Sequence, residues 1–142
     1  MTIGYIENIL LYPGAMPFQV KIDTGAKTSS IDVREISEFE RDNSQWVRFT
    51  IANNEGRTAT LERPVFRTVK VRRADTAKQT RLVVKLGICL GGYFKNAQVN
   101  LNKRAAMSYR MLIGRSFLAD KFFIDSSAKK LTSPDCPEAP RK

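Results

Sequence analysis

The sequence predicts a single all-β domain, on the strength of three observations. Short runs rich in Val, Ile, Phe and Thr alternate with clusters of turn residues along most of the 142-residue chain. Apolar residues seldom recur at the spacing of a long amphipathic helix. Hydrophobic residues make up 42% of the chain, which is normal for a globular protein with one core and argues against wholesale disorder.

The first half of the chain is expected to contain four strands. The first ends at Pro13-Gly14, a pair typical of turns, and the second ends at Asp23-Thr24-Gly25. The third alternates between apolar and polar positions, and a turn at 53–56 leads the chain back into the fourth. These strands are 3–11, 18–22, 46–52 and 57–61.

The second half is expected to hold two hairpins, two short strands and a helical turn. The first hairpin is long and has a polar tip at 73–78, and Gly91-Gly92 closes the second. The arms of the hairpins are 65–72 with 81–86, and 86–90 with 93–101. The other elements are a strand at 111–113, a helix at 117–121 capped by Ser116, and a strand at 122–124. The domain is therefore expected to span 1–130, with 131–142 as a flexible, proline-containing tail.

The chain is strongly basic and its charge is unevenly distributed. It has 24 Lys and Arg against 14 Asp and Glu, a net charge of +10. Residues 57–85 hold nine basic and two acidic side chains, whereas 32–42 hold five acidic and two basic ones. A solvated surface is the simplest interpretation, although a basic face also attracts nucleic acid, anionic lipid or acidic polypeptides. The sequence has no aromatic-basic RNA signature and no zinc-finger spacing, so it does not favour nucleic acid.

Nothing in the sequence predicts a membrane segment or a leader. No apolar run approaches the roughly 18 residues that span a bilayer. Residues 1–12 lack the basic start and small-residue cleavage site of a signal peptide. We expect a soluble protein, either cytoplasmic or periplasmic.

The two cysteines predict no disulfide framework. Cys89 lies in an apolar run and is most simply a small buried side chain, whereas Cys136 lies in the proline-containing tail. Whether the two interact stays open at this point.

The absence of histidine excludes much hydrolase chemistry. Without histidine there is no Ser-His-Asp or Cys-His catalysis and no His-ligated metal, and two cysteines do not make a closed zinc site. We therefore expect no metal and no cofactor. Chemistry in this chain must use carboxylates, Lys, Tyr, Ser or backbone groups.

One motif fits carboxylate chemistry. The alternating strand 18–22 delivers Asp23 into a tight turn, where Thr24 supplies a hydroxyl and Gly25 permits a positive φ and close backbone approach. By itself this three-residue string is a weak signal and is more simply an ordinary strand-ending turn. About ninety residues later, the apolar strand 111–113 runs into Gly114-Arg115 and then a helix start.

In combination, the Asp23-Thr24-Gly25-Ala26 loop and the Gly114-Arg115 strand resemble the paired signature of retropepsin-like aspartic peptidases. KIDTGAKTSS at 21–30, FERDNSQWVRF at 39–49 and YRMLIGRSFLADKFFID at 109–125 are similar to a bacterial branch of that group. The branch is often labelled ATP-dependent zinc protease and is associated with ATP-grasp ligases that attach glutamates to proteins. The resemblance covers 3–130 and implies a closed acid-protease barrel with one short helix after the Gly-Arg strand. Both parts of the label fail here, because the chain has neither His-Glu-x-x-His nor a Walker-type phosphate loop.

The resemblance also implies roles for individual residues. Asp23 would be the catalytic carboxylate. Thr24 would join the active-site loops of two subunits, and the loop glycine and alanine would present backbone groups to the substrate. The implied supporting residues are Thr24, Gly25, Ala26, Gly114 and Arg115. Viral members usually carry acidic or Asn side chains where this chain has Lys27 and Ser116, so their ionic network is not expected here. Asp32 stands where bacterial relatives often have histidine and is most simply a surface acid.

Counting carboxylates predicts a homodimer. Aspartic peptidases need two carboxylates about 3 Å apart that share one proton, and this chain has one Asp-Thr-Gly. Two copies of Asp23 would then meet across a twofold axis. Asp125 also ends a strand, but Ser126-Ser127 after it resembles an ordinary turn rather than a second active-site loop.

The function that the sequence favours is an aspartic-type endopeptidase that activates water by general acid-base catalysis. An extended substrate would lie across the dimer cleft under a flap formed by the hairpin at 65–86. That hairpin fits equally well as a sheet edge protected by Lys and Arg; as a flap, its charge would favour acidic substrates. The rival interpretations are a catalytically silent module that binds an anionic polypeptide and a basic β-barrel that binds nucleic acid.

Overall fold

The computed structural model describes residues 1–72, 78–103 and 108–141 and is nearly all-β, as the sequence predicts. A short helix, α1 (Arg115–Leu118), follows the ninth strand. The strands are β1 (Thr2–Tyr12), β2 (Met16–Asp23), β3 (Ser29–Arg41), β4 (Ser44–Ala52), β5 (Thr58–Pro64), β6 (Arg67–Arg72), β7 (Lys78–Leu90), β8 (Tyr93–Asn102), β9 (Met111–Gly114) and β10 (Phe123–Lys129). In the described part of the chain, no helix is long and apolar enough to cross a membrane.

Six strands close into a barrel. Their order around the ring is β1-β2-β9-β3-β8-β7, and the second half of β1 pairs with β7 to complete the closure. Two further strands extend the sheet beyond this ring, β10 beside the start of β1 and β6 beside β7. The expected acid-protease type of closed barrel is confirmed.

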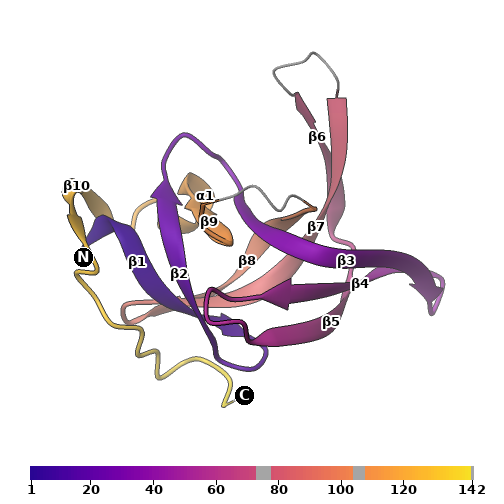
Figure 1. Ribbon diagram of the computed structural model, residues 1–142, viewed down its shortest axis with the longest axis horizontal. Helices are drawn as coiled ribbons and strands as arrows, with labels where there is room; N and C mark the ends of the chain where they lie inside the picture. Colours follow the sequence, from indigo (N-terminus) through magenta and orange to yellow (C-terminus); the bar gives the residue numbers. More distant parts are fainter. Residues whose placement is uncertain (73–77, 104–107, 142) are drawn as a thin grey trace.

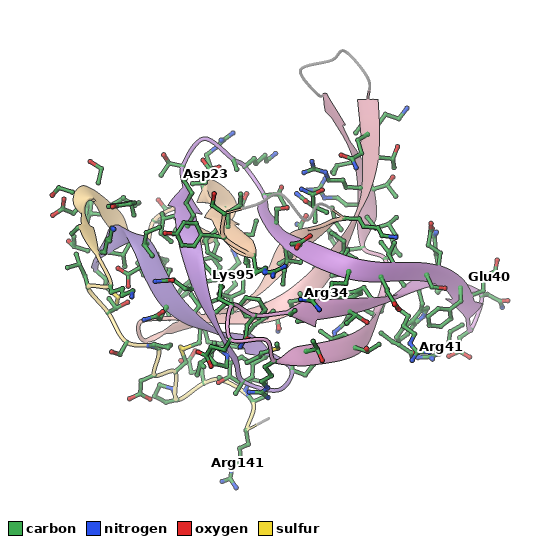
Figure 2. All side chains as sticks on the ribbon, in the orientation of Figure 1. Asp23, Arg34, Glu40, Arg41, Lys95 and Arg141 are labelled. Atoms are coloured by element: carbon green, nitrogen blue, oxygen red, sulfur yellow. A yellow bond between two sulfur atoms is a disulfide. The ribbon has the colours of Figure 1, made fainter. Side chains whose placement is uncertain are left out.

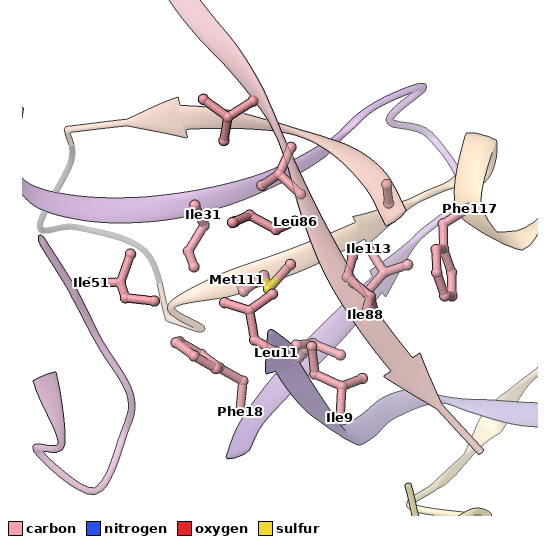
Figure 3. Close-up of a cluster of buried hydrophobic side chains, with 14 of the residues drawn as sticks. Ile9, Leu11, Phe18, Ile31, Ile51, Leu86, Ile88, Met111, Ile113 and Phe117 are labelled. Atoms are coloured by element: carbon pink, nitrogen blue, oxygen red, sulfur yellow. The ribbon is translucent and has the colours of Figure 1, made fainter. Parts of the chain in front are cut away.

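Alternation of side chains along the strands fills the barrel with apolar groups. In β2, Met16, Phe18, Val20 and Ile22 are buried, whereas Lys21 is exposed on the outer face. The same inward alternation in β1, β7, β8 and β9 produces one continuous core, part of which is drawn in Figure 3. Because a strand repeats every two residues, the register of each strand also decides which side chains face outward around Asp23.

Two hairpin structures project from the barrel (Figure 1). The β6–β7 hairpin confirms the long hairpin expected from the sequence, although its expected tip at 73–78 lies largely outside the described residues. The other projection is made by the distal part of β3 with β4 and β5. Strand β3 is the main element absent from the expectations, and a bulge between Val33 and Glu35 separates its barrel part from its projecting part.

The segment after β10 is attached to the barrel where it begins. Its first residues run beside β1, where Lys130 N donates to Ile6 O at 2.7 Å. The buried carboxylate of Glu7 accepts bonds from the amides of Leu131 and Thr132 and from the Thr132 hydroxyl. These contacts attach the start of the segment to the barrel.

A disulfide joins Cys89 at the end of β7 to Cys136, 47 residues later. The interpretation of Cys89 as a simple buried thiol was therefore wrong, although the residue is fully buried. Spacing along the chain did not indicate this pairing, because the contact depends on where the tail crosses the β7–β8 turn. The amide of Asp135 also donates to Gly91 O at this turn, at 2.8 Å.

The helix begins earlier than expected. Gly114 is the residue before its first turn and provides no side-chain cap. Ser116 lies inside the helix rather than at the cap position, so the expected capping role was wrong. Its amide instead donates to Lys27 O at 3.0 Å, which connects the helix start to the loop after Asp23.

Candidate active site

Asp23 lies at the last position of β2, on the rim of the barrel (Figure 2). Strand β2 runs parallel to β9, and the register places Asp23 directly beside Gly114. The two segments that the sequence singled out, about ninety residues apart, are therefore neighbours. Asp23 is partly buried, so its carboxylate is held by the loop and still reaches solvent.

The loop after β2 folds back onto the Asp23 carboxylate. The Gly25 amide donates to Asp23 Oδ1 at 3.0 Å, and the Ala26 amide donates to the Asp23 carbonyl at 3.2 Å. A Cβ added at Gly25 would lie 3.2 Å from the same carboxylate oxygen. Gly25 does not adopt the positive φ that the sequence suggested. The absence of a Cβ instead lets the loop lie close to the carboxylate.

Backbone bonds from the start of α1 support this loop from behind. The amide of Arg115 donates to Ala26 O at 2.8 Å. A Cβ added at Gly114 would lie 2.8 Å from Ala26 O and from the carbonyl carbon of Thr28. Only glycine lets the β9 backbone lie this close to the loop, as the predicted supporting role of Gly114 requires.

The side chain of Arg115 holds the outer part of the loop. Its Nη1 donates to Gly25 O at 3.2 Å and to Thr24 O at 3.4 Å. The Thr24 side chain is exposed at the tip of the loop. The six predicted site residues thus form one unit: Asp23, Thr24, Gly25, Ala26, Gly114 and Arg115.

Ser29 is a supporting residue that the sequence did not indicate. It is buried at the start of β3, and its hydroxyl accepts a bond from the Gly114 amide at 3.0 Å. This bond joins β3 to β9 directly beneath the loop. A single serine in a Thr-Ser-Ser run has no pattern that distinguishes it from its neighbours, so only the fold identifies it.

Two hollows lie in the region of the loop, and the first of them is lined in part by the loop itself. The first, about 500 Å³, lies between the loop and the β6–β7 hairpin and is lined by residues that include Lys27, Arg67 and Arg81. The second, about 380 Å³, lies on the outer face of β1, β2 and β9 and includes Lys21 and Lys129. None of the described residues that line either hollow is acidic. Leu112 belongs to both hollows, so they meet at this residue of β9, whose register partner on β2 is Lys21.

Lys129 is held toward the second hollow by an aromatic neighbour. Its ammonium lies 5.5 Å from the centre of the Tyr5 ring, which also lines the hollow. A hydrogen bond with the Tyr5 side chain raises the pKa of Lys129 above its ordinary value. Lys129 thus contributes a positive charge to the hollow.

Among the residues that the structure describes, a single subunit presents one carboxylate at this site. Within the described part of the chain, the Asp23 carboxylate bonds to the Gly25 amide and to no second carboxylate. The Asp125 carboxylate is engaged in its own turn, where it accepts from the Ser127 amide and hydroxyl. These bonds lower the pKa of Asp125. The described residues also contain no group of three or more Asp, Glu or Cys side chains placed to hold a metal ion.

Comparison with known proteins gives matches over almost the whole chain. A family model described as "RimB-like: Retropepsin-like aspartic endopeptidase RimB" matches residues 2–135. A crystal structure of protein Lpg0085 from Legionella pneumophila, described as of unknown function (DUF785), superposes with a TM-score of 0.80 at 28% identity. That match covers 93% of this chain and 98% of the other.

Curated relatives carry a different name. A probable alpha-L-glutamate ligase from Desulfotalea psychrophila is 32% identical over 115 residues, which is 79% of this chain and 25% of that protein. A probable alpha-L-glutamate ligase from Shewanella halifaxensis is 31% identical over 117 residues, which is 80% of this chain and 26% of that protein. The chain thus spans about a quarter of the length of the curated relatives that it matches.

Proposed function

The chain belongs to the RimB-like family of retropepsin-like aspartic endopeptidases, and from this premise we propose that it hydrolyses peptide bonds with Asp23 as its catalytic carboxylate. The observation that carries the proposal is the position of Asp23. Its carboxylate is fixed by the Gly25 amide in a loop that Gly114 and Arg115 support from behind. Such fixed delivery of a carboxylate is what general acid-base catalysis requires.

The reaction needs a second carboxylate, and we take it from a second copy of the chain. Two Asp23 side chains about 3 Å apart would share one proton, because both cannot ionise at that distance. The charged carboxylate would take a proton from water, which attacks the scissile carbonyl, while the protonated one donates to the carbonyl oxygen. Collapse of the tetrahedral intermediate transfers a proton to the leaving amine and restores the pair. The exposed Thr24 lies where the loops of the two subunits would touch.

The flanking hollows support acidic polypeptides as substrates. Among the described residues, no acidic side chain lines the two hollows and five basic ones do: Lys21, Lys27, Arg67, Arg81 and Lys129. A twofold axis through the Asp23 pair would repeat both hollows on each side of the scissile bond. The names of the curated relatives, probable alpha-L-glutamate ligases, also connect the shared section to glutamate chemistry. The β6–β7 hairpin borders the first hollow through Arg67 and Arg81, which suits the role of a flap over the substrate.

Substitution of Asp23 by Asn tests the proposal. Asn has nearly the same shape and cannot act as a base, so we expect cleavage of a glutamate-rich peptide to fall by at least about a thousandfold. Circular dichroism should show that the variant folds like the wild type. Cleavage that survives Asp23→Asn would refute the aspartic mechanism, and cleavage abolished by a chelator would point to a metal instead. Binding without cleavage by the wild type would support the silent binding module.

A further inference from the structure

We propose that a surface next to the cleft is a second binding site for acidic polypeptides, and we name it the Lys85 surface. It consists of Arg63, Phe66, Lys85 and Lys95. This inference rests on the proposed function for the identity of the ligand. It goes beyond that function by assigning a site outside the two hollows at Asp23.

The Lys85 surface contains two hollows of its own that meet at Lys85. One, about 340 Å³, includes Arg63 and Phe66, and the other, about 190 Å³, includes Lys95. Lys85 lines both, and no described residue that lines either is acidic. Glu62, next to Arg63 in the sequence, bonds instead to Arg41 at 2.8 Å. The surface therefore presents uncompensated positive charge to a ligand.

The Lys85 surface is continuous with the hollow beside the active-site loop. Arg67 lines that hollow, and its Nε donates to Gln98 Oε1 at 2.7 Å. Gln98 is the direct cross-strand partner of Lys85 and lines the smaller hollow with it. A polypeptide that leaves the cleft past Arg67 would therefore meet Lys85 next, because extended chain advances only about 3.3 Å per residue.

Protection of a sheet edge does not explain the charge on Lys85. Lysines that prevent edge-to-edge aggregation belong on outermost strands. Lys85 lies on β7, which is not an outermost strand, because it pairs with β8 on one side and on the other with β6 up to Val83 and with β1 from Gly87. Its ammonium lies 4.3 Å from the centre of the Phe66 ring, which is 49% exposed. Together they offer a cation for a carboxylate and an apolar surface for the methylene groups of an acidic side chain.

The test compares short and long acidic peptides on an inactive protein. In the Asp23→Asn background, we would measure binding of a glutamate peptide of about six residues, which spans about 20 Å, and of one about three times longer. For Lys85→Glu/Lys95→Glu we expect the Kd of the long peptide to rise about tenfold and that of the short peptide to change less than about twofold. The loss should shrink as salt is raised.

A matched control separates local from global charge effects. Arg34→Glu/Arg141→Glu changes the net charge equally at exposed positions outside the Lys85 surface, and Arg141 lies at the far end of the tail from Asp23 (Figure 2). We expect it to bind both peptides like its parent. Equal weakening in the two double variants, or equal weakening for both peptide lengths, would overturn the proposal. Single-stranded RNA that binds through Lys85 and Lys95 more tightly than the long peptide would overturn it in favour of a nucleic-acid site.

Because these are binding measurements, they distinguish the two proposals from each other. If the wild type fails to cleave any acidic peptide while the length-dependent binding persists, the proposed function fails and the Lys85 surface stands. If cleavage of the short peptide depends on Asp23 but the long peptide gains nothing from Lys85 and Lys95, the proposed function stands and the proposal of the Lys85 surface fails.

Discussion

Gly114 shows how a single missing side chain controls the geometry of the active-site loop. A Cβ at this position would meet Ala26 O and the Thr28 carbonyl carbon at 2.8 Å and the Lys27 carbonyl carbon at 3.0 Å. All three are backbone atoms, so no change of rotamer relieves the overlap. The loop or the strand must move, and the Asp23 carboxylate moves with it.

We therefore expect Gly114→Ala to lower both stability and activity. Replacing glycine in a strand by alanine ordinarily gains about 0.5–1 kcal/mol from reduced chain entropy, but overpacking of this kind costs about 1–3 kcal/mol. The net effect should be destabilisation in urea unfolding, with peptidase activity reduced more than tenfold because displacement of the catalytic group by about 1 Å is costly.

Gly92→Ala is the control for this prediction. Its added Cβ would meet only Asp135 O, at an ordinary contact distance of 3.8 Å. We expect it to unfold and cleave like the wild type. If Gly114→Ala matched Gly92→Ala in both measurements, close approach at Gly114 would not be what positions the loop.

At the same scale, the sequence predicted the centre of the candidate site better than its surroundings. Asp23-Thr24-Gly25-Ala26 and Gly114-Arg115 are local strings, and each is recognisable from adjacent residues. Ser29 was missed because its role depends on a bond to Gly114 across 85 positions of sequence. Lys21 and Lys129 come together in one hollow only through the register of β1, β2 and β10, which charge counts along the chain do not reveal.

At the scale of elements, the expected strands were those with clear apolar alternation or strong turn residues. Strands β1, β2, β4, β5 and the hairpins around 73–77 and 91–92 were expected in this way. Strand β3 was missed because its projecting part carries Glu35, Glu38 and Glu40 and lacks a buried face of its own. It is held as a strand by its pairing with β4, which is a tertiary contact rather than a local preference.

The attachment of the tail to the barrel could not be predicted from the sequence either. The disulfide in this region leads to a prediction about stability. Cys89–Cys136 closes a loop of 47 residues, and closure of a loop of this size restricts the unfolded chain by an amount worth about 2–4 kcal/mol. We expect Cys89→Ala/Cys136→Ala to lower the free energy of unfolding by this amount in urea titrations without a reductant.

A dithiol reductant provides the control for the tail. It should shift the urea midpoint of the wild type toward that of the double variant and leave the double variant unchanged. The Glu7 carboxylate still binds Leu131 and Thr132 when the disulfide is absent, so the barrel and the Asp23 loop should persist. An unchanged wild-type midpoint after full reduction would show that the disulfide adds no stability.

At the scale of the whole molecule, the barrel presents Asp23 on its rim, on the side from which the β6–β7 hairpin projects (Figures 1 and 2). Under the proposed function, this single carboxylate would be half of an aspartic dyad. The two basic hollows share Leu112 on β9, two residues before Gly114, which is the register partner of Asp23. The arrangement fits a substrate clamped between two copies of the chain.

Mixing active and inactive subunits tests this assembly directly. If wild-type and Asp23→Asn chains are refolded together in equal amounts, random pairing makes about one quarter of the dimers wild type on both sides and about half of them mixed. Because a mixed dimer holds one Asp23, activity per wild-type chain should fall about twofold, and further as the variant is added in excess. A site completed within one chain would instead keep its activity per wild-type chain at every ratio.

Asp125→Asn chains serve as the control, since that carboxylate bonds to Ser127 in its own turn, and mixtures with them should keep full activity. Loss of activity in pure Asp125→Asn would identify Asp125 as the second carboxylate and replace the homodimer with an intrachain dyad.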